Sequence, residues 1–136
     1  MLRFPTAFAI ILEVTEPDKR AAGNDSSPGG SADVGTSRLE ILTQLVERNP
    51  KDSFALYGLA MEYAAREEYE KAMEQFRKLC EVNPNYSYAY FHGGRVLAKM
   101  GQIEEARRFY EKGIEVTTRT GDAHAKGELE AALAEL

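Results

Sequence analysis

The sequence has no tryptophan and a single cysteine, and it contains no long apolar run. Since Cys80 cannot form a disulfide within one chain, we expect a reducing compartment and place the protein in the cytoplasm. No stretch approaches the roughly 18 apolar residues of a membrane span. Basic side chains number 17 against 22 acidic ones. Nucleic acid requires a basic face, so the net charge of −5 argues against a nucleic-acid partner.

Signatures of catalysis and of metal binding are also missing. His92 and His124 fall on different expected helices, without the three or four convergent ligands that a metal ion requires. Cys80 occupies a position that Val46 and Ile114 hold 34 residues before and after it, which indicates a buried apolar side chain and not a nucleophile. We therefore expect no enzyme and no cofactor. An enzymatic or metal-binding role would require Cys80, His92 and His124 to converge.

A pattern of residues is written twice between Leu56 and Thr118, at a spacing of 34. The matches fall on apolar or small positions, while the charged positions differ between the copies. They pair Leu56 with Tyr90, Ala60 with Gly94, Tyr63 with Leu97, Ala72 with Ala106, and Phe76 with Tyr110. A period of this length is typical of stacked units of two helices. Within each unit the apolar residues return every three or four residues, as amphipathic helices require.

This pattern resembles the tetratricopeptide repeat (TPR) family. The first copy carries the family's residues as Leu56, Leu59-Ala60, Tyr63, Ala72, Phe76 and Pro84. The second copy has Thr118 in place of the proline. The resemblance covers residues 38–136 and implies an all-α fold, an open right-handed superhelix of about two full repeats. A half-repeat helix precedes them and a capping helix closes the array.

We expect six helices, over residues 38–48, 53–66, 69–82, 87–99, 103–116 and 122–135. Ser37 and Glu40 have the spacing of a capping box, and Asp52 and Asp122 are positioned to cap the helices that follow them. The run from Thr118 to Gly121 is expected to break the helix before it. Without a proline at 118, however, that helix is free to run a turn further.

The expected domain organisation places an apolar segment and a linker in residues 1–35 and the TPR domain in residues 36–136. The repeats span 53–86 and 87–120, with the capping helix over 122–135. Residues 15–35 are rich in Pro, Gly, Ser, Asp and Asn, a composition that predicts disorder. The apolar residues 1–14 allow several interpretations: a short local segment, a cleaved signal, or an internal ligand for this chain's groove or a neighbour's.

The candidate binding site is the side of the first helices that faces away from the packed residues. The resemblance implies that this side lines a concave groove. It contains Phe54, Tyr57 and Met61 from the first copy and Tyr88, Phe91, Arg95 and Lys99 from the second. A row of exposed aromatic rings suggests an apolar partner, and the basic Arg95 and Lys99 suggest a carboxylate on that partner. The other interpretation is that some of the rings pack between neighbouring helices or under the last helix.

Some TPR proteins bind the acidic C-terminus of heat-shock chaperones through Lys and Asn side chains on these helices. The corresponding positions hold Tyr57, Met61, Phe91 and Arg95, and only Arg95 suits an acidic tail. We therefore expect a non-catalytic adaptor for a peptide or protein with apolar side chains and one carboxylate. The alternative is a structural protein that self-associates, as a homodimer, through an exposed repeat face or through its N-terminal segment.

Overall fold

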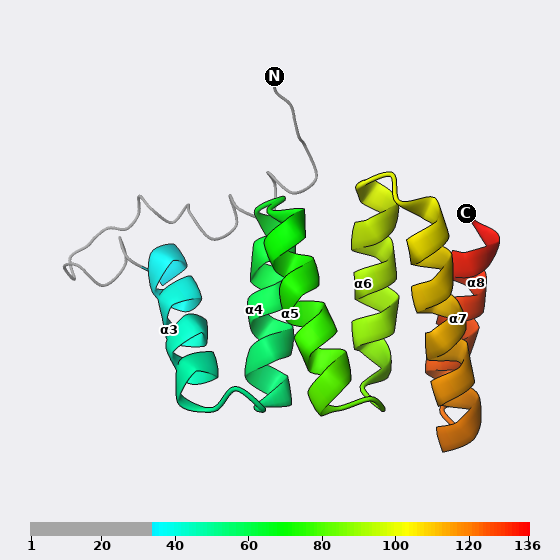
Figure 1. The fold of residues 1–136 in the computed structure, drawn as a ribbon, viewed down its shortest axis with the longest axis horizontal. Coiled ribbons are helices and arrows are strands. Elements are labelled where there is room, and N and C mark those ends of the chain that lie inside the picture. The colour runs from blue at the N-terminus through cyan, green and yellow to red at the C-terminus, as the bar shows by residue number, and fades with distance from the viewer. Residues whose placement is uncertain (1–33) are drawn as a thin grey trace.

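The structure, a computed structural model, describes residues 34–136, and this part of the chain contains helices and no strand. The expectations for the apolar segment and the linker, residues 1–35, lie outside it except for Val34 and Gly35, which belong to the first described helix. The helices stand side by side, with α3 at one end and α8 at the other (Figure 1). Their bounds are α3 Val34–Arg48, α4 Ser53–Ala65, α5 Tyr69–Val82, α6 Ser87–Lys99, α7 Ile103–Thr120 and α8 Ala123–Ala134. The expected all-α repeat fold is confirmed.

Two aspartates cap helices as the sequence predicts. The Oδ1 atom of Asp52 accepts a hydrogen bond from the Ala55 amide at 3.1 Å, which fixes the start of α4. The Oδ1 atom of Asp122 accepts one from the Ala125 amide at 3.1 Å, at the start of α8. Each bond satisfies an amide that has no partner within its own helix. The closing helix therefore begins with the same device as the first helix of the first full repeat.

Two helix ends differ from the sequence expectation by four residues, and the other differences are of one residue. α3 begins at Val34, so Ser37 lies inside the helix and the expected start at residue 38 is wrong. α7 continues through Thr118 and ends at Thr120, so the expected break at 118 is wrong and the extra turn is confirmed. Gly121 stops the helix with a φ of 82°, a left-handed conformation that costs glycine little.

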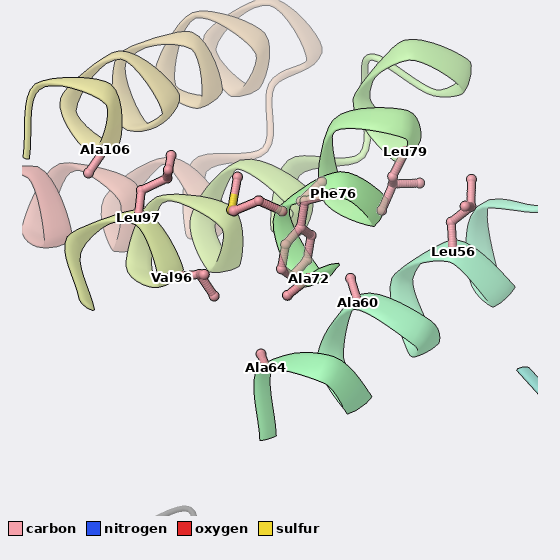
Figure 2. Packing of buried hydrophobic residues seen from close by; sticks show 11 residues of the cluster. Leu56, Ala60, Ala64, Ala72, Phe76, Leu79, Val96, Leu97 and Ala106 are labelled. Atoms are coloured by element: carbon pink, nitrogen blue, oxygen red, sulfur yellow. The ribbon is translucent and has the colours of Figure 1, made fainter. Parts of the chain in front are cut away.

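At one point in the core of each complete pair, a small residue of the first helix is matched by a ring of the second. Ala60 of α4 and Phe76 of α5 are both fully buried in one cluster, which Figure 2 shows together with Leu97 of α6. In the next pair, Gly94 of α6 lies so close to the Tyr110 ring of α7 that any side chain at 94 would collide with it. This close packing orients α4 and α6 and leaves their other side free for a site.

Candidate aromatic binding face

The structure places the predicted site residues in two classes of burial. Phe54 is 73% exposed, and Arg95 and Lys99 are exposed as well. The half-buried residues are Tyr57, Met61, Tyr88 and Phe91. Tyr57 and Met61 pack against the buried cluster that joins α4, α5 and α6, whereas Phe91 packs against a second cluster that includes Leu129 of α8. Each of the two sequence interpretations, surface and packing, thus applies to part of the set.

His92, which the sequence analysis considered only as a metal ligand, lies among these rings. Its ring centroid is 5.9 Å from that of Tyr57, 6.1 Å from that of Tyr88 and 5.0 Å from that of Phe91. Such ring pairs contribute about 0.5–1.5 kcal/mol each beyond the area they bury. His92 therefore connects the aromatic residues of α6 to those of α4. Together with Phe54 and Arg95, these residues form what we call the aromatic face: Phe54, Tyr57, Tyr88, Phe91, His92 and Arg95.

Tyr86 supports the aromatic face from its edge. It stands at the N-terminal end of α6, and its ring centroid is 5.4 Å from that of Tyr57. The sequence analysis missed both Tyr86 and His92. A signal for His92 was present, because residues four apart share a helix face and His92 follows Tyr88 by four. Tyr86 precedes the helix, so no helical spacing could have placed it.

Burial keeps His92 neutral. It lowers the pKa of the imidazole from 6.5 to about 4, and the positive charge of Arg95 acts in the same direction. The negative charge of Glu128, on α8, acts against both. At neutral pH the ring is uncharged and packs as an aromatic side chain would. The positive charge of the aromatic face is therefore that of Arg95.

Arg95 and Glu128 give the aromatic face its polar features. The guanidinium of Arg95 lies over the Phe91 ring, 5.6 Å from its centroid, while the side chain remains exposed. A guanidinium held in this way is available to a carboxylate. Burial and, next, the Glu128 carboxylate raise the pKa of the Tyr88 hydroxyl. The Oε1 atom of Glu128 is buried and accepts no hydrogen bond from the described residues.

The remaining reactive side chains show no catalytic arrangement. Burial raises the pKa of the Cys80 thiol to about 11, which keeps it protonated and unreactive at neutral pH. His124 is exposed on α8 and lies 3.4 Å from a Glu128 carboxylate oxygen. Within residues 34–136, no three His, Cys, Asp or Glu side chains gather as a metal ion would require. No helix in the same range combines the length and the apolar character needed to cross a bilayer.

A shallow hollow lies away from the aromatic face, on the exposed side of α5. It is lined by alternating charges: Glu70, Lys71, Glu74, Arg77, Lys78 and Glu81. Arg77 is already paired with Glu105 of α7, at 2.6 Å between Nη2 and Oε2. With acidic and basic groups interspersed, this surface selects neither sign of charge. Its exposed residues therefore offer a control surface for variants of the aromatic face.

Comparison with known proteins agrees with the fold. A model described as TPR repeat matches residues 61–101, and one described as tetratricopeptide repeat matches residues 87–118. A solved tetratricopeptide repeat domain protein from Salinibacter ruber is 30% identical, with a TM-score of 0.58. The match covers 62% of this chain and 93% of that one. The chain belongs to the tetratricopeptide repeat family.

Other known proteins are matched over different shares of their length. A heat-shock protein cognate co-chaperone from Aspergillus fumigatus is 32% identical over 90 residues, which make up 65% of this TPR chain and 26% of that protein. PcrH, solved in complex with the chaperone binding region of PopD, has a TM-score of 0.70 over 99% of this chain and 96% of its own. At 14% identity, this second likeness is one of fold.

Proposed function

We propose that this TPR chain is a non-catalytic adaptor that binds a segment of a partner protein on its aromatic face. The observation that carries the proposal is the 73% exposure of Phe54, beside the half-buried Tyr57 three residues further along α4. Each apolar Å² that a partner removes from water contributes about 25 cal/mol. A large exposed ring next to other aromatic side chains is typical of a surface that a partner covers.

The chemistry of the aromatic face favours a segment with apolar side chains and one carboxylate. The rings of Tyr57, Tyr88 and Phe91 are already held by contacts with His92, so little ordering cost is incurred on binding. Arg95 offers a positive group to the carboxylate.

The comparisons support a protein partner. The Aspergillus relative is named a co-chaperone, and PcrH was solved with a region of another protein bound to it. A role without catalysis is supported by the protonated Cys80 thiol and by the position of His92 between rings. Self-association remains the alternative function, since Ile41 of α3 is 54% exposed.

A capture experiment with matched variants tests the proposal. The full chain is immobilised and exposed to lysate of the source cell, beside Phe54→Ala/Arg95→Ala and a control, Glu74→Ala/Lys78→Ala, on the exposed side of α5. All four side chains are exposed, so both variants are expected to stay folded, as circular dichroism will verify. We expect one protein to be captured by wild type and control and to fall about tenfold on the aromatic-face variant, since two contacts of about 0.7 kcal/mol each correspond to that factor.

Equal capture by all three proteins would move the interaction to another surface. Capture of nothing, together with a dimer of the wild type in light scattering, would favour self-association.

A further inference from the structure

Within residues 34–136, no helix covers the outer side of α3, whereas its counterparts are covered by one. α3 is the second helix of a pair, like α5 and α7. A residue of α3 corresponds to the residue 34 positions later in α5 and 68 positions later in α7. Its Ile41 corresponds to Gln75 and Phe109, which are 7% exposed and half-buried, respectively. Phe109 reaches the first helix of its own pair, because a Cβ added at Gly93 would lie 2.6 Å from its Cε2 atom. Ile41 has no such helix within residues 34–136 and is 54% exposed.

At the other end of the array, α8 carries charged side chains on its outer side. α8 begins 70 residues after α4, and both helices start at an aspartate cap. In this register Lys126 and Glu130 of α8 take the places of the buried Leu56 and Ala60, where a further second helix would pack. Copies of the chain stacked head to tail would therefore place these charges against Ile41. The α3 end needs a different cover.

The sequence before α3 repeats the buried pattern of a first helix. In α4 and α6 the buried residues form two adjacent pairs, four residues apart. They are Ala55-Leu56 and Leu59-Ala60 in α4, and Ala89-Tyr90 and Gly93-Gly94 in α6. Ala7-Phe8 and Ile11-Leu12 have the same spacing, and Ala7 matches the alanines at 55 and 89.

Two prolines bracket this pattern. Pro5 corresponds to Ser53 and Ser87, the first residues of α4 and α6, where proline is favoured in a helix. Pro17 follows twelve residues later, and a proline is common just past a helix end. The bracketed residues 5–16 number twelve, the length of α8 and one less than the length of α4 or α6.

At one packed position, this segment holds a larger residue than α4 and α6 do, and α3 holds a smaller residue than α5 and α7 do. In the two complete pairs, a small residue on the first helix, Ala60 or Gly94, is matched by a ring on the second, Phe76 or Tyr110. The position of that ring on α3 holds the smaller Leu42. The matching position in the segment holds Leu12, which is larger than alanine or glycine. The summed number of side-chain non-hydrogen atoms is thus the same in all three pairs.

We propose that residues 5–16 form the missing first helix and pack on α3 of the same molecule, with Ile11 against Ile41. The chain then contains three complete helix pairs. Residues 17–33 connect the two helices, and a flexible chain of this length spans about 20–25 Å. α3 itself is about 22 Å long, so the connection reaches either end of it. Tethering gives the segment an effective concentration in the millimolar range, which exceeds that of a second copy in dilute solution.

Disulfide trapping in the full chain tests the proposal. The variant Ile11→Cys/Ile41→Cys is made in a Cys80→Val background, since Val46 stands at the equivalent position of α3. In a glutathione redox buffer we expect a disulfide within one chain, seen as a faster monomer band on a non-reducing gel. We also expect a higher Tm for the oxidised form. The control Glu13→Cys/Ile41→Cys, with residue 13 on the opposite side of the same segment, is expected to form at least tenfold less of the disulfide.

Three results would overturn the proposal. A covalent dimer would mean that a second copy covers α3, and equal trapping by the control would mean that contact is unspecific. If the variant Ile11→Cys/Arg95→Cys formed its disulfide efficiently and Ile11→Cys/Ile41→Cys did not, the segment would lie on the aromatic face.

A double-mutant cycle gives a second readout that does not depend on a disulfide. Ile11→Asp and Ile41→Asp are each expected to lower the Tm of the full chain. The two together are expected to lower it by clearly less than the sum of the single changes, because both break one contact. Thr6→Asp, which corresponds to the exposed Phe54, is expected to leave the Tm unchanged. Additive losses would contradict contact between Ile11 and Ile41.

Discussion

Replacing Leu59 with aspartate is expected to unfold the domain at room temperature or to lower its Tm by more than about 15 °C. Leu59 is 3% exposed on the packed side of α4. The change removes about 1.5–3 kcal/mol of apolar burial and places a charge where it has no partner. The total loss of about 4 kcal/mol or more is a large fraction of the 5–15 kcal/mol that stabilises a typical domain. Thermal unfolding followed by circular dichroism measures it.

The same helix supplies the matched control for this prediction. Phe54→Asp introduces the same charge in place of a larger apolar side chain, but Phe54 is 73% exposed. We expect a change in stability within about 0.5 kcal/mol. Tyr57→Ala should fall between the two, with a loss of about 1–2 kcal/mol, because the ring contacts Tyr86 and His92. If Phe54→Asp destabilised the domain as much as Leu59→Asp, the exposed side of α4 would be part of the core.

Acidification is expected to destabilise the domain through His92. Burial, and then Arg95, lower the pKa of His92 from 6.5 to about 4 in the folded protein. Between these values the unfolded chain binds more protons than the folded one, so stability falls as the pH drops from about 6.5 towards 4. Each pKa unit corresponds to about 1.4 kcal/mol. Since the ring is partly exposed, we expect a loss of about 2 kcal/mol in total.

The free energy of unfolding is measured with denaturant at pH 7 and at pH 4.5, for wild type and for His92→Gln. The difference between the two proteins gives the contribution of His92 to the loss of stability. Carboxylates also begin to titrate in this range, but they do so in both proteins, so the difference between them isolates His92. His124→Gln, which replaces the exposed histidine of α8, is the matched control. If His92→Gln lost as much stability between pH 7 and pH 4.5 as wild type does, the imidazole would not titrate within the ring cluster.

The fold was largely predictable because its signals, the helical periodicity and the 34-residue repeat, lie in the sequence itself. The 34-residue spacing places Ala60 and Gly94 opposite Phe76 and Tyr110, and the structure buries all four. The boundary errors also have local causes. A capping box at Ser37 and Glu40 competes with a helix that can start earlier, and the propensity of four residues is too weak to decide between them.

The candidate site was only partly predictable, because it depends on contacts between helices. Spacing alone puts Phe54 and Tyr88 on one face, but Phe54 is 73% exposed whereas Tyr88 is half-buried next to Glu128 of α8. α7 is longer than the first repeat suggests, and α8, which supplies Glu128, begins just after it at Ala123. His92 corresponds to Gly58 in the first copy, so comparison of the copies gave no reason to consider it.

The most direct test of the central claim maps the bound partner on the chain. The segment of the captured partner is titrated into ¹⁵N-labelled protein, and amide and aromatic side-chain signals are followed by NMR. We expect the largest shifts at Phe54, Tyr57, Phe91 and Arg95, with little change on the exposed side of α5 around Glu74. Shifts confined to α5 or to α3, with the aromatic face unchanged, would contradict it.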